Sequence, residues 1–198
     1  MMKKIKSEAG LTVVEMLAAV VVLVLLALMV GTGIDMAMHA YETVVAQSEA
    51  ELLLSTAIDA LADDLRYAWN VKPENAPSWT GYDHVTGFTY SSDSFGDGVR
   101  LCVKKNEGKI IAKTEGDSKF DQQVLSINAG AYGSNKSYKE YSVDGMFIKY
   151  DPAKNTFTIH LKVTDGSGIT AITPGSDTND IKNSTEGGVT VRCLNPPA

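Results

Sequence analysis

The first third of the chain lacks helix breakers. All six prolines lie at or after Pro73, and 14 of the 17 glycines lie at or after Gly81. Because proline and glycine are the residues that most disfavour a helix interior, residues 11–69 are predicted to form one continuous helix. Such a helix extends about 88 Å, which is too long for the interior of a small domain. Part of it is therefore expected in a membrane or in the core of an assembly.

Enzyme motifs are also missing. The sequence contains no HExxH, GxSxG, GxxxxGK or CxxC pattern, the common signatures of zinc proteases, serine hydrolases, phosphate-binding loops and dithiol redox centres. The three histidines, His39, His84 and His160, are scattered, and we expect surface polar residues rather than ligands. The sequence thus predicts a protein that is not an enzyme and that carries no cofactor.

Excess positive charge is lacking. The formal net charge is −6, and removal of residues 1–10, which hold three lysines and one glutamate, would make it −8. Broad binding to nucleic acid requires clustered lysine and arginine to neutralise phosphates. No broad nucleic-acid binding is therefore expected.

Charged side chains are absent from Met16 to Ile34. As a helix, these 19 residues span about 28 Å, close to the thickness of the hydrocarbon core of a bilayer. Lys3, Lys4 and Lys6 precede the run, and Glu15 stands at its edge. A charged residue inside a membrane segment costs about 2.5 to 3.5 kcal/mol even on lenient scales. Glu15 is therefore predicted to have a function.

A cut after Gly10 would give Glu15 a partner. The new α-amino group of Leu11 would lie one helical turn from Glu15, or opposite Glu15 of a neighbouring copy. A buried charge pair is costly to break by removing one member, so this pair can set the register between subunits.

The segment from Lys3 to Ile34 resembles the class III leader of type IV pilins and pseudopilins. It has a basic leader that ends in glycine, an apolar first mature residue, Thr12-Val13-Val14, glutamate at the fifth mature position and an uninterrupted apolar helix. The resemblance implies that prepilin peptidase cleaves between Gly10 and Leu11 and methylates the amine of Leu11. It also implies that Glu15 guides the subunit into a helical filament.

The resemblance further implies partners and a location. The partners are the peptidase, other pilin subunits, the membrane, an assembly ATPase and its platform protein. The positive-inside rule keeps the leader in the cytoplasm, so the chain would be a single-pass membrane protein before it joins a filament on the cell surface. The pattern favours a minor pilin or pseudopilin and leaves open whether the filament is a pilus, a type II secretion pseudopilus or a DNA-uptake fibre.

Three other interpretations of this segment are open. A secretory signal peptide has a shorter apolar region and a small-residue exit, whereas the best exit here is the poor Val30-Gly31-Thr32-Gly33. A plain single-pass anchor gives no reason for Glu15. The alternative of a different class is a membrane-anchored binding module, an adhesin or DNA receptor, that does not polymerise.

The expected organisation has four parts. Residues 1–10 form the leader, 11–34 the half of the helix in the membrane or filament core, 35–69 an amphipathic half, and 70–198 a β-rich head. An apolar stripe at three- and four-residue spacing predicts the face of the second half that packs on a sheet. The stripe comprises Ala50, Leu54, Ala57, Ile58, Leu61 and Leu65.

Gly31 and Gly33 are the weak place in the helix, because each glycine costs roughly 0.5 to 1 kcal/mol relative to alanine. They predict either a hinge, or simply the membrane exit or a site of close helix contact.

After Trp69 the spacing of apolar residues changes from a helical to a strand-like period. Residues 70–84 are expected to form a loop.

Short strands bounded by turn residues are expected in the head. They are predicted over 85–90, 99–105, 109–114, 123–128 and 189–194, with a hairpin over 145–164 whose turn is Asp151-Pro152-Ala153-Lys154-Asn155. An antiparallel sheet laid on the helix gives an α+β fold. The pilin-like fold, a long N-terminal helix packed on a C-terminal antiparallel sheet, has this layout.

Cysteine is scarce, with Cys102 and Cys193 in separate predicted strands. In an exported domain an even count is compatible with a disulfide, and the pilin resemblance favours one, whereas the alternation around Cys102 is equally compatible with a buried thiol.

Two surface features leave alternatives open. Asp177, Asn179 and Asp180 offer oxygen ligands suited to calcium, as in the C-terminal loop of some pseudopilins, or form an ordinary exposed turn. An aromatic group is predicted to be either core or a binding surface. It comprises Tyr67, Trp69, Trp79, Tyr82, Phe88 and Tyr90.

Overall fold

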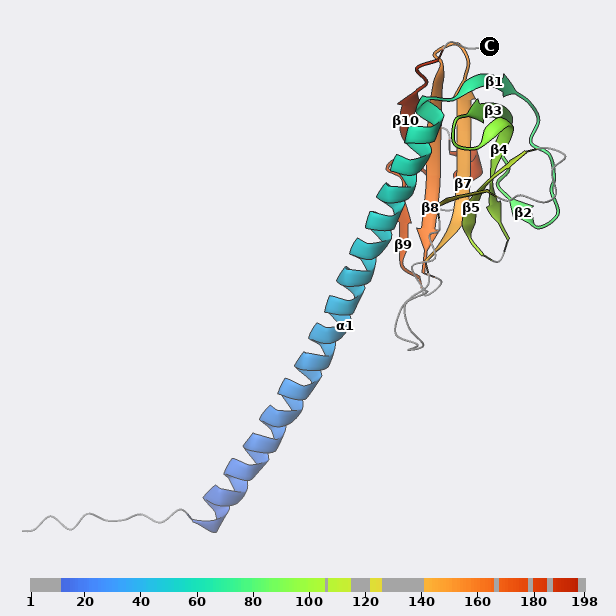
Figure 1. Ribbon diagram of the computed structural model, residues 1–198. Coiled ribbons are helices and arrows are strands. Elements are labelled where there is room, and N and C mark those ends of the chain that lie inside the picture. Colours follow the sequence, from blue (N-terminus) through green and yellow to red (C-terminus); the bar gives the residue numbers. More distant parts are fainter. Residues whose placement is uncertain are drawn as a thin grey trace, which may run out of the picture. The chain divides into compact units, whose positions relative to one another are not determined.

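The computed structural model describes residues 12–105, 107–114, 122–125, 141–165, 168–177, 180–184 and 187–195. One long helix, α1 (Val13–Arg66), runs through the first third of the chain (Figure 1). The prediction of one continuous helix is confirmed from Val13 to Arg66, but it is wrong for residues 67–69, since Trp69 already begins a strand, and Leu11 lies outside the described residues. The chain divides into two compact units, Met1–Val44 and Val45–Ala198, so α1 supplies residues to both.

The second unit contains two antiparallel sheets rather than the one that was expected (Figure 1). The first has the order β1-β3-β4-β5-β6, with β2 paired to β4, and the second has the order β10-β8-β7, with β9 paired to β8. The first sheet comprises β1 (Trp69–Pro73), β2 (Tyr82–Asp83), β3 (Phe88–Ser92), β4 (Gly96–Lys104), β5 (Lys109–Thr114) and β6 (Gln122–Leu125). The second comprises β7 (Ser142–Asp151), β8 (Thr156–Thr164), β9 (Thr170–Ile172) and β10 (Val189–Arg192), with the short 3-10 helix η1 (Ile181–Asn183) between β9 and β10.

The segment expected to be a loop, residues 70–84, holds two short strands. β1 pairs with β3 through an irregular register between Trp69 and Lys72, and Asn70 takes a positive φ of 53° there. Pro73 ends β1, where a missing N–H costs the ladder nothing. β2 is only two residues long and pairs with β4.

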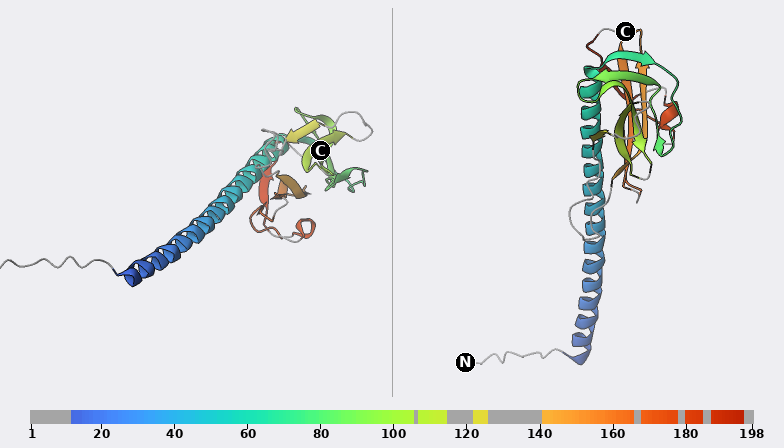
Figure 2. Two further views of the ribbon diagram at one scale, coloured as in Figure 1. Left: turned by 90° about the horizontal axis from the view of Figure 1, so that it is seen from below. Right: turned by 45° about the vertical axis from the view of Figure 1, so that its right-hand side comes forward.

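The predicted apolar stripe of α1 is buried in one core with both sheets. Ala50, Ala57, Leu61 and Leu65 are fully buried, Leu54 nearly so, and Ile58 packs at the edge. The first sheet contributes side chains such as Phe88, Tyr90 and Leu101, and the second contributes Phe157, Ile159, Leu161 and Val163. The views of Figure 2 show the two sheets beside this part of the helix. The amphipathic interpretation of the second half of the helix is thereby confirmed.

The predicted hairpin is confirmed as β7 and β8. The Asp151 carboxylate accepts hydrogen bonds from the backbone N–H groups of Ala153 (3.0 Å) and Lys154 (3.3 Å). Asn155 has a φ of 51°, a conformation that asparagine tolerates better than most residues. The turn chemistry and the alternation of β8 therefore agree with the fold.

The C-terminal segment covers the end of α1. The N–H of Leu194 donates to the carbonyl of Arg66 (2.8 Å), and the side-chain amide of Asn195 donates to the carbonyl of Tyr67 (2.7 Å). Because the last carbonyls of a helix have no partner within it, these bonds satisfy groups that would otherwise need water.

Candidate functional site

The predicted processing and assembly site lies at the start of α1. Gly10 and Leu11, the predicted cleavage and methylation positions, lie outside the described residues. The described helix therefore begins beside the predicted cut, with Thr12 and Glu15 in its first turn.

Thr12 and Glu15 hold each other through three hydrogen bonds. The N–H and the hydroxyl of Thr12 both donate to Oε2 of Glu15, at 2.8 and 2.9 Å, and the N–H of Glu15 approaches Oγ1 of Thr12 at 3.3 Å. This reciprocal arrangement is a capping box, which satisfies backbone donors at a helix start. The Thr-x-x-Glu spacing could have been found in the sequence, and our sequence interpretation missed it.

The first turns of α1 carry apolar side chains on every side. Among the described residues, α1 is the one helix long and apolar enough to cross a membrane, and none of its most apolar 18-residue stretch is buried. The large exposed side chains include Val13, Met16, Leu17, Val20, Leu23, Leu25, Leu28, Met29 and Ile34. A helix that is apolar all round needs an apolar environment, so this segment fits a membrane anchor.

Gly31 and Gly33 lie inside continuous helix. A methyl group at either position would meet nothing within 4 Å. The hydroxyl of Thr32 donates to the carbonyls of Leu28 (3.2 Å) and Met29 (3.0 Å), a back-bonding that often bends helices. The hinge and the close-contact interpretations both remain predictions.

Cys102 and Cys193 are not joined in a disulfide, so the disulfide alternative is wrong for this structure. The sulfur of Cys102 donates to the carbonyl of Ile111 (3.6 Å), and that of Cys193 donates to the carbonyl of Ala68 (3.1 Å). Cys102 belongs to the first sheet, whereas Cys193 follows β10 of the second. Each buried thiol therefore has its own backbone acceptor.

The residues proposed for calcium are only partly described. Asp177 and Asp180 are exposed, and Asn179 lies outside the described residues. Within the described ranges, no group of three or more His, Cys, Asp and Glu side chains could hold a metal ion.

Two of the histidines are less exposed than expected. His160 is 3% exposed, and its Nδ1 lies 2.7 Å from Oγ of Ser176, which in turn lies 2.7 Å from Oγ1 of Thr173. Burial lowers the pKa of His160, so the ring favours its neutral form. These bonds fasten the turn after β9 to β8. The surface expectation is wrong for His160, and His84 is half-buried.

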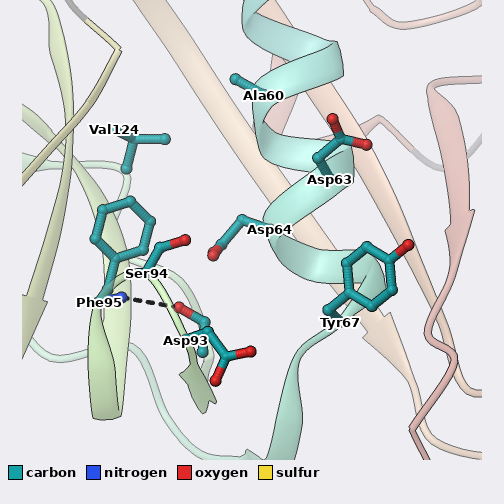
Figure 3. Close-up of a pocket in the computed structure, with 9 residues that line it drawn as sticks. Ala60, Asp63, Asp64, Tyr67, Asp93, Ser94, Phe95 and Val124 are labelled. Carbon is teal, nitrogen blue, oxygen red and sulfur yellow. Dashed lines mark hydrogen bonds between the residues drawn. The ribbon is translucent and has the colours of Figure 1, made fainter.

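An acidic cavity of about 400 Å³ lies at the C-terminal end of α1. Figure 3 shows Asp64 pointing from the helix toward the turn between β3 and β4, which holds Asp93, Ser94 and Phe95, whereas Asp63 points away from this turn. The hydroxyl of Tyr90, a buried residue, donates to Asp64 at 2.6 Å. Burial raises the pKa of Asp64, and the hydrogen bonds from Tyr90 and Ser92 oppose that change.

The predicted aromatic group separates into two sets. Phe88 and Tyr90 are core residues. Trp79 and Tyr82 are half-exposed, with ring centroids 6.2 Å apart, and the ammonium of Lys113 lies 4.4 Å from the Tyr82 centroid. The core alternative is right for Phe88 and Tyr90 and fails for Trp79 and Tyr82; of the other two members, Trp69 is half-exposed and Tyr67 is 57% exposed.

Comparison of the chain with family models, with curated proteins and with solved structures finds no match.

Proposed function

We propose that this chain is a type IV pilin-like filament subunit, a minor pilin or pseudopilin, without enzymatic activity. One observation carries the proposal: a single helix whose first half exposes apolar side chains all round and whose second half is the core of a β-rich unit. The carboxylate of Glu15 at the start of that helix agrees with it.

The exposed half of α1 needs a cover of lipid or protein. In a bilayer, lipid tails surround these apolar side chains. Because lipid is as apolar as the side chains, helices associate there through close packing and polar contacts rather than through the hydrophobic effect. In a filament, the same side chains would pack against the helices of other subunits. Transfer from lipid to filament thus exchanges one apolar environment for another.

Glu15 can take part in this exchange. Within one chain its carboxylate already accepts two hydrogen bonds from Thr12, which lowers the cost of holding the charge at the membrane edge. In the filament, the amine of a neighbour's Leu11 would replace or join these donors as a charged partner. The partner would fix the register between adjacent helices.

The proposed sequence begins with insertion, with Lys3, Lys4 and Lys6 in the cytoplasm. Prepilin peptidase then cleaves after Gly10 and methylates Leu11. An assembly ATPase and its platform protein, with other pilins, then move the subunit into a filament on the cell surface.

Mass spectrometry of the N-terminus of the mature protein tests the processing. We expect a chain that begins at a methylated Leu11. An intact Met1, or a cut after Gly33, would overturn the proposal.

Substitution of Glu15 tests the assembly step. Glutamine can serve in a capping box, so Glu15→Gln keeps the helix start and removes only the charge. We expect normal insertion and cleavage but at least a tenfold lower yield in sheared filaments. Glu42→Gln is the matched control, because Glu42 is exposed on the same helix beyond the apolar run. Equal filament yields from the two variants would remove Glu15 from the mechanism, whereas the absence of filaments from the parent chain would favour the non-polymerising binding module.

A further inference from the structure

The β2 segment, residues 82–85, forms one wall of a second cavity of about 400 Å³. β7 and η1 contribute facing residues of the lining, among them Phe147 and Lys182. β2 is held to the first sheet by its pairing with β4, which extends over two residues only. Regions with few such bonds open at a lower free-energy cost than the core does. The β2 segment can therefore separate from its neighbours while the rest of the head stays folded.

His84, the residue after β2, resists a positive charge. Its Nδ1 is buried and has no hydrogen-bond partner among the described residues. Whichever nitrogen carries the hydrogen in the neutral ring, both nitrogens carry one in the imidazolium ion. Protonation therefore leaves a buried N–H at Nδ1 without an acceptor, which costs free energy as long as the β2 segment stays in place. Opening of the segment would let water accept this hydrogen bond.

The charges around His84 do not compensate for this cost. Burial, and after it the charge of Lys182, lowers the pKa of His84, whereas Asp83 and Asp144 oppose that change with smaller effects. Both carboxylates already pair with lysines, that of Asp83 at 3.3 Å. The charged residues that border this cavity and the two cavities beside it are Asp83, Lys104, Lys105, Asp144, Lys162, Asp180 and Lys182.

We propose that the β2 segment is an acid-sensitive latch, closed against β7 and η1 when His84 is neutral and open when His84 takes up a proton. The closed state binds this proton less readily than the open state does, so acid favours opening. The effect begins as the pH falls through the ordinary histidine pKa of 6.5 and is complete below the lowered pKa of the closed state. Because one proton is taken up, the opening equilibrium constant rises in this window by up to about tenfold per pH unit.

Hydrogen exchange of the full chain in a nonionic detergent, from about pH 7.5 to about pH 5, tests the latch. The reporters are the amides of residues 82–85 and the N–H of Lys105, which donates to the carbonyl of Gly81 beside β2 (2.9 Å). After correction for intrinsic exchange rates, we expect their protection to fall by up to about tenfold per pH unit below pH 6.5. The amides of β5, which is paired on both sides, should keep their protection.

Substitution of His84 assigns the effect to this ring. His84→Asn removes the titrating group, and asparagine tolerates the positive φ of 54° at this position. We expect this variant to lose the fall in protection below pH 6.5. His39→Asn is the matched control, because the side chain of His39 is 83% exposed on α1, and its pH dependence should equal that of the parent chain. Thermal unfolding at neutral pH confirms that each variant is folded.

Substitution of Lys182 tests the contribution of charge. Lys182→Gln removes the second cause of the lowered pKa of His84, so the pH window of opening becomes narrower. We expect a smaller total fall in protection of the β2 segment than in the parent chain. Lys154→Gln, a change to an exposed lysine of the β7–β8 turn, is the matched control and should leave the fall unchanged.

Two results would overturn the proposal. An equal fall in protection in the parent chain and in His84→Asn would assign the acid effect to other groups. A ring of His84 that titrates at or above pH 6.5 in NMR spectra of the parent chain would show that the closed segment does not resist the proton, and this measurement needs no variant that folds. Filament formation enters neither measurement, so their failure is separate from failure of the proposed function.

Discussion

Arg100 shows, at the residue scale, how a charge is held inside the head. Its side chain is 2% exposed and pairs with Glu74, which is 43% exposed, while its guanidinium also donates to the carbonyl of Thr86 at 3.0 Å. Removal of one member of a buried pair costs about 3 to 5 kcal/mol. Because water reaches Glu74, we expect Glu74→Ala to lower the free energy of unfolding by about 3 kcal/mol, measured by denaturant titration.

Glu107→Ala is the matched control for that measurement. Glu107 pairs with Lys104 and Lys109, each at 2.7 Å, at the surface. Water screens pairs at the surface, so they contribute little to stability, and the control should change the free energy of unfolding far less. Equal losses of unfolding free energy from the two variants would show that the burial of Arg100 does not make its pair with Glu74 more stabilising than a surface pair.

The raised pKa of Asp64 predicts that the stability of the folded chain depends on pH. Burial raises its pKa in the folded chain, so the folded state binds this proton more readily than the unfolded state does. The contribution is therefore fully present below the unfolded pKa and is lost as the pH rises through the folded value. Relative to Asp64→Asn, the wild type should lose stability as the pH rises above the ordinary aspartate pKa of about 4 and through the raised pKa of the folded chain.

Denaturant titrations at a series of pH values measure this difference. Asp63→Asn, a change to an exposed neighbour on the same helix turn, controls for the loss of one negative charge. A wild type that gains stability relative to Asp64→Asn as the pH rises would mean that the hydrogen bonds from Tyr90 and Ser92 outweigh burial.

At the residue scale, the sequence could have predicted only those contacts whose signal is local. The Thr12-x-x-Glu15 capping box is a short pattern that could have been found. The partner of Arg100 could not, because Glu74 lies 26 residues away and neither residue type specifies which opposite charge it meets. The burial of Nδ1 of His84 without a hydrogen-bond partner among the described residues likewise could not be predicted, because it depends on how the surrounding chain packs.

The second half of α1 shows, at the element scale, what periodicity can predict. Its apolar stripe gave the buried face correctly because the period of 3.6 residues places every member on one side. Periodicity does not say what covers that face. Both sheets contribute to the core, whereas one had been expected.

Two leucines on opposite faces of α1 test this assignment. Leu61 is fully buried and Leu52 is 67% exposed. Truncation of a buried leucine to alanine costs about 2 to 5 kcal/mol, while exposed substitutions usually stay within about 0.5 kcal/mol. Thermal and denaturant unfolding should therefore separate Leu61→Ala strongly from Leu52→Ala. Similar losses would contradict the buried face.

Short strands escaped prediction for a different reason. β2 has two residues and β9 has three, which is too few for an alternating pattern. β1 contains Asn70 at positive φ and ends at Pro73, both features of loops. Their pairing is decided by neighbouring strands rather than by their own residues.

The whole molecule divides within α1, at a point that no residue in the sequence marks. The boundary between the compact units falls between Val44 and Val45, about ten residues beyond the boundary expected at residue 34. Tyr141 marks the start of the packed region, since its hydroxyl donates to the carbonyl of Ala46 (2.9 Å) and lies 3.3 Å from Glu49. The buried contacts of the helix thus begin before the predicted stripe.

Truncation tests this division. A chain of residues 45–198 lacks the exposed apolar segment and keeps both contacts of Tyr141, so we expect a soluble, monomeric, cooperatively unfolding domain. Size-exclusion chromatography and circular dichroism without detergent measure this outcome.

A chain of residues 50–198 is the matched comparison. It loses both acceptors of the Tyr141 hydroxyl and the buried side chain of Ala46, so part of the packing that covers Tyr141 is removed. Its melting temperature should therefore be lower. Aggregation of the 45–198 chain would show that this part of the protein is not soluble without the apolar segment. Equal melting temperatures would show that the contacts of Tyr141 with the helix do not stabilise the head.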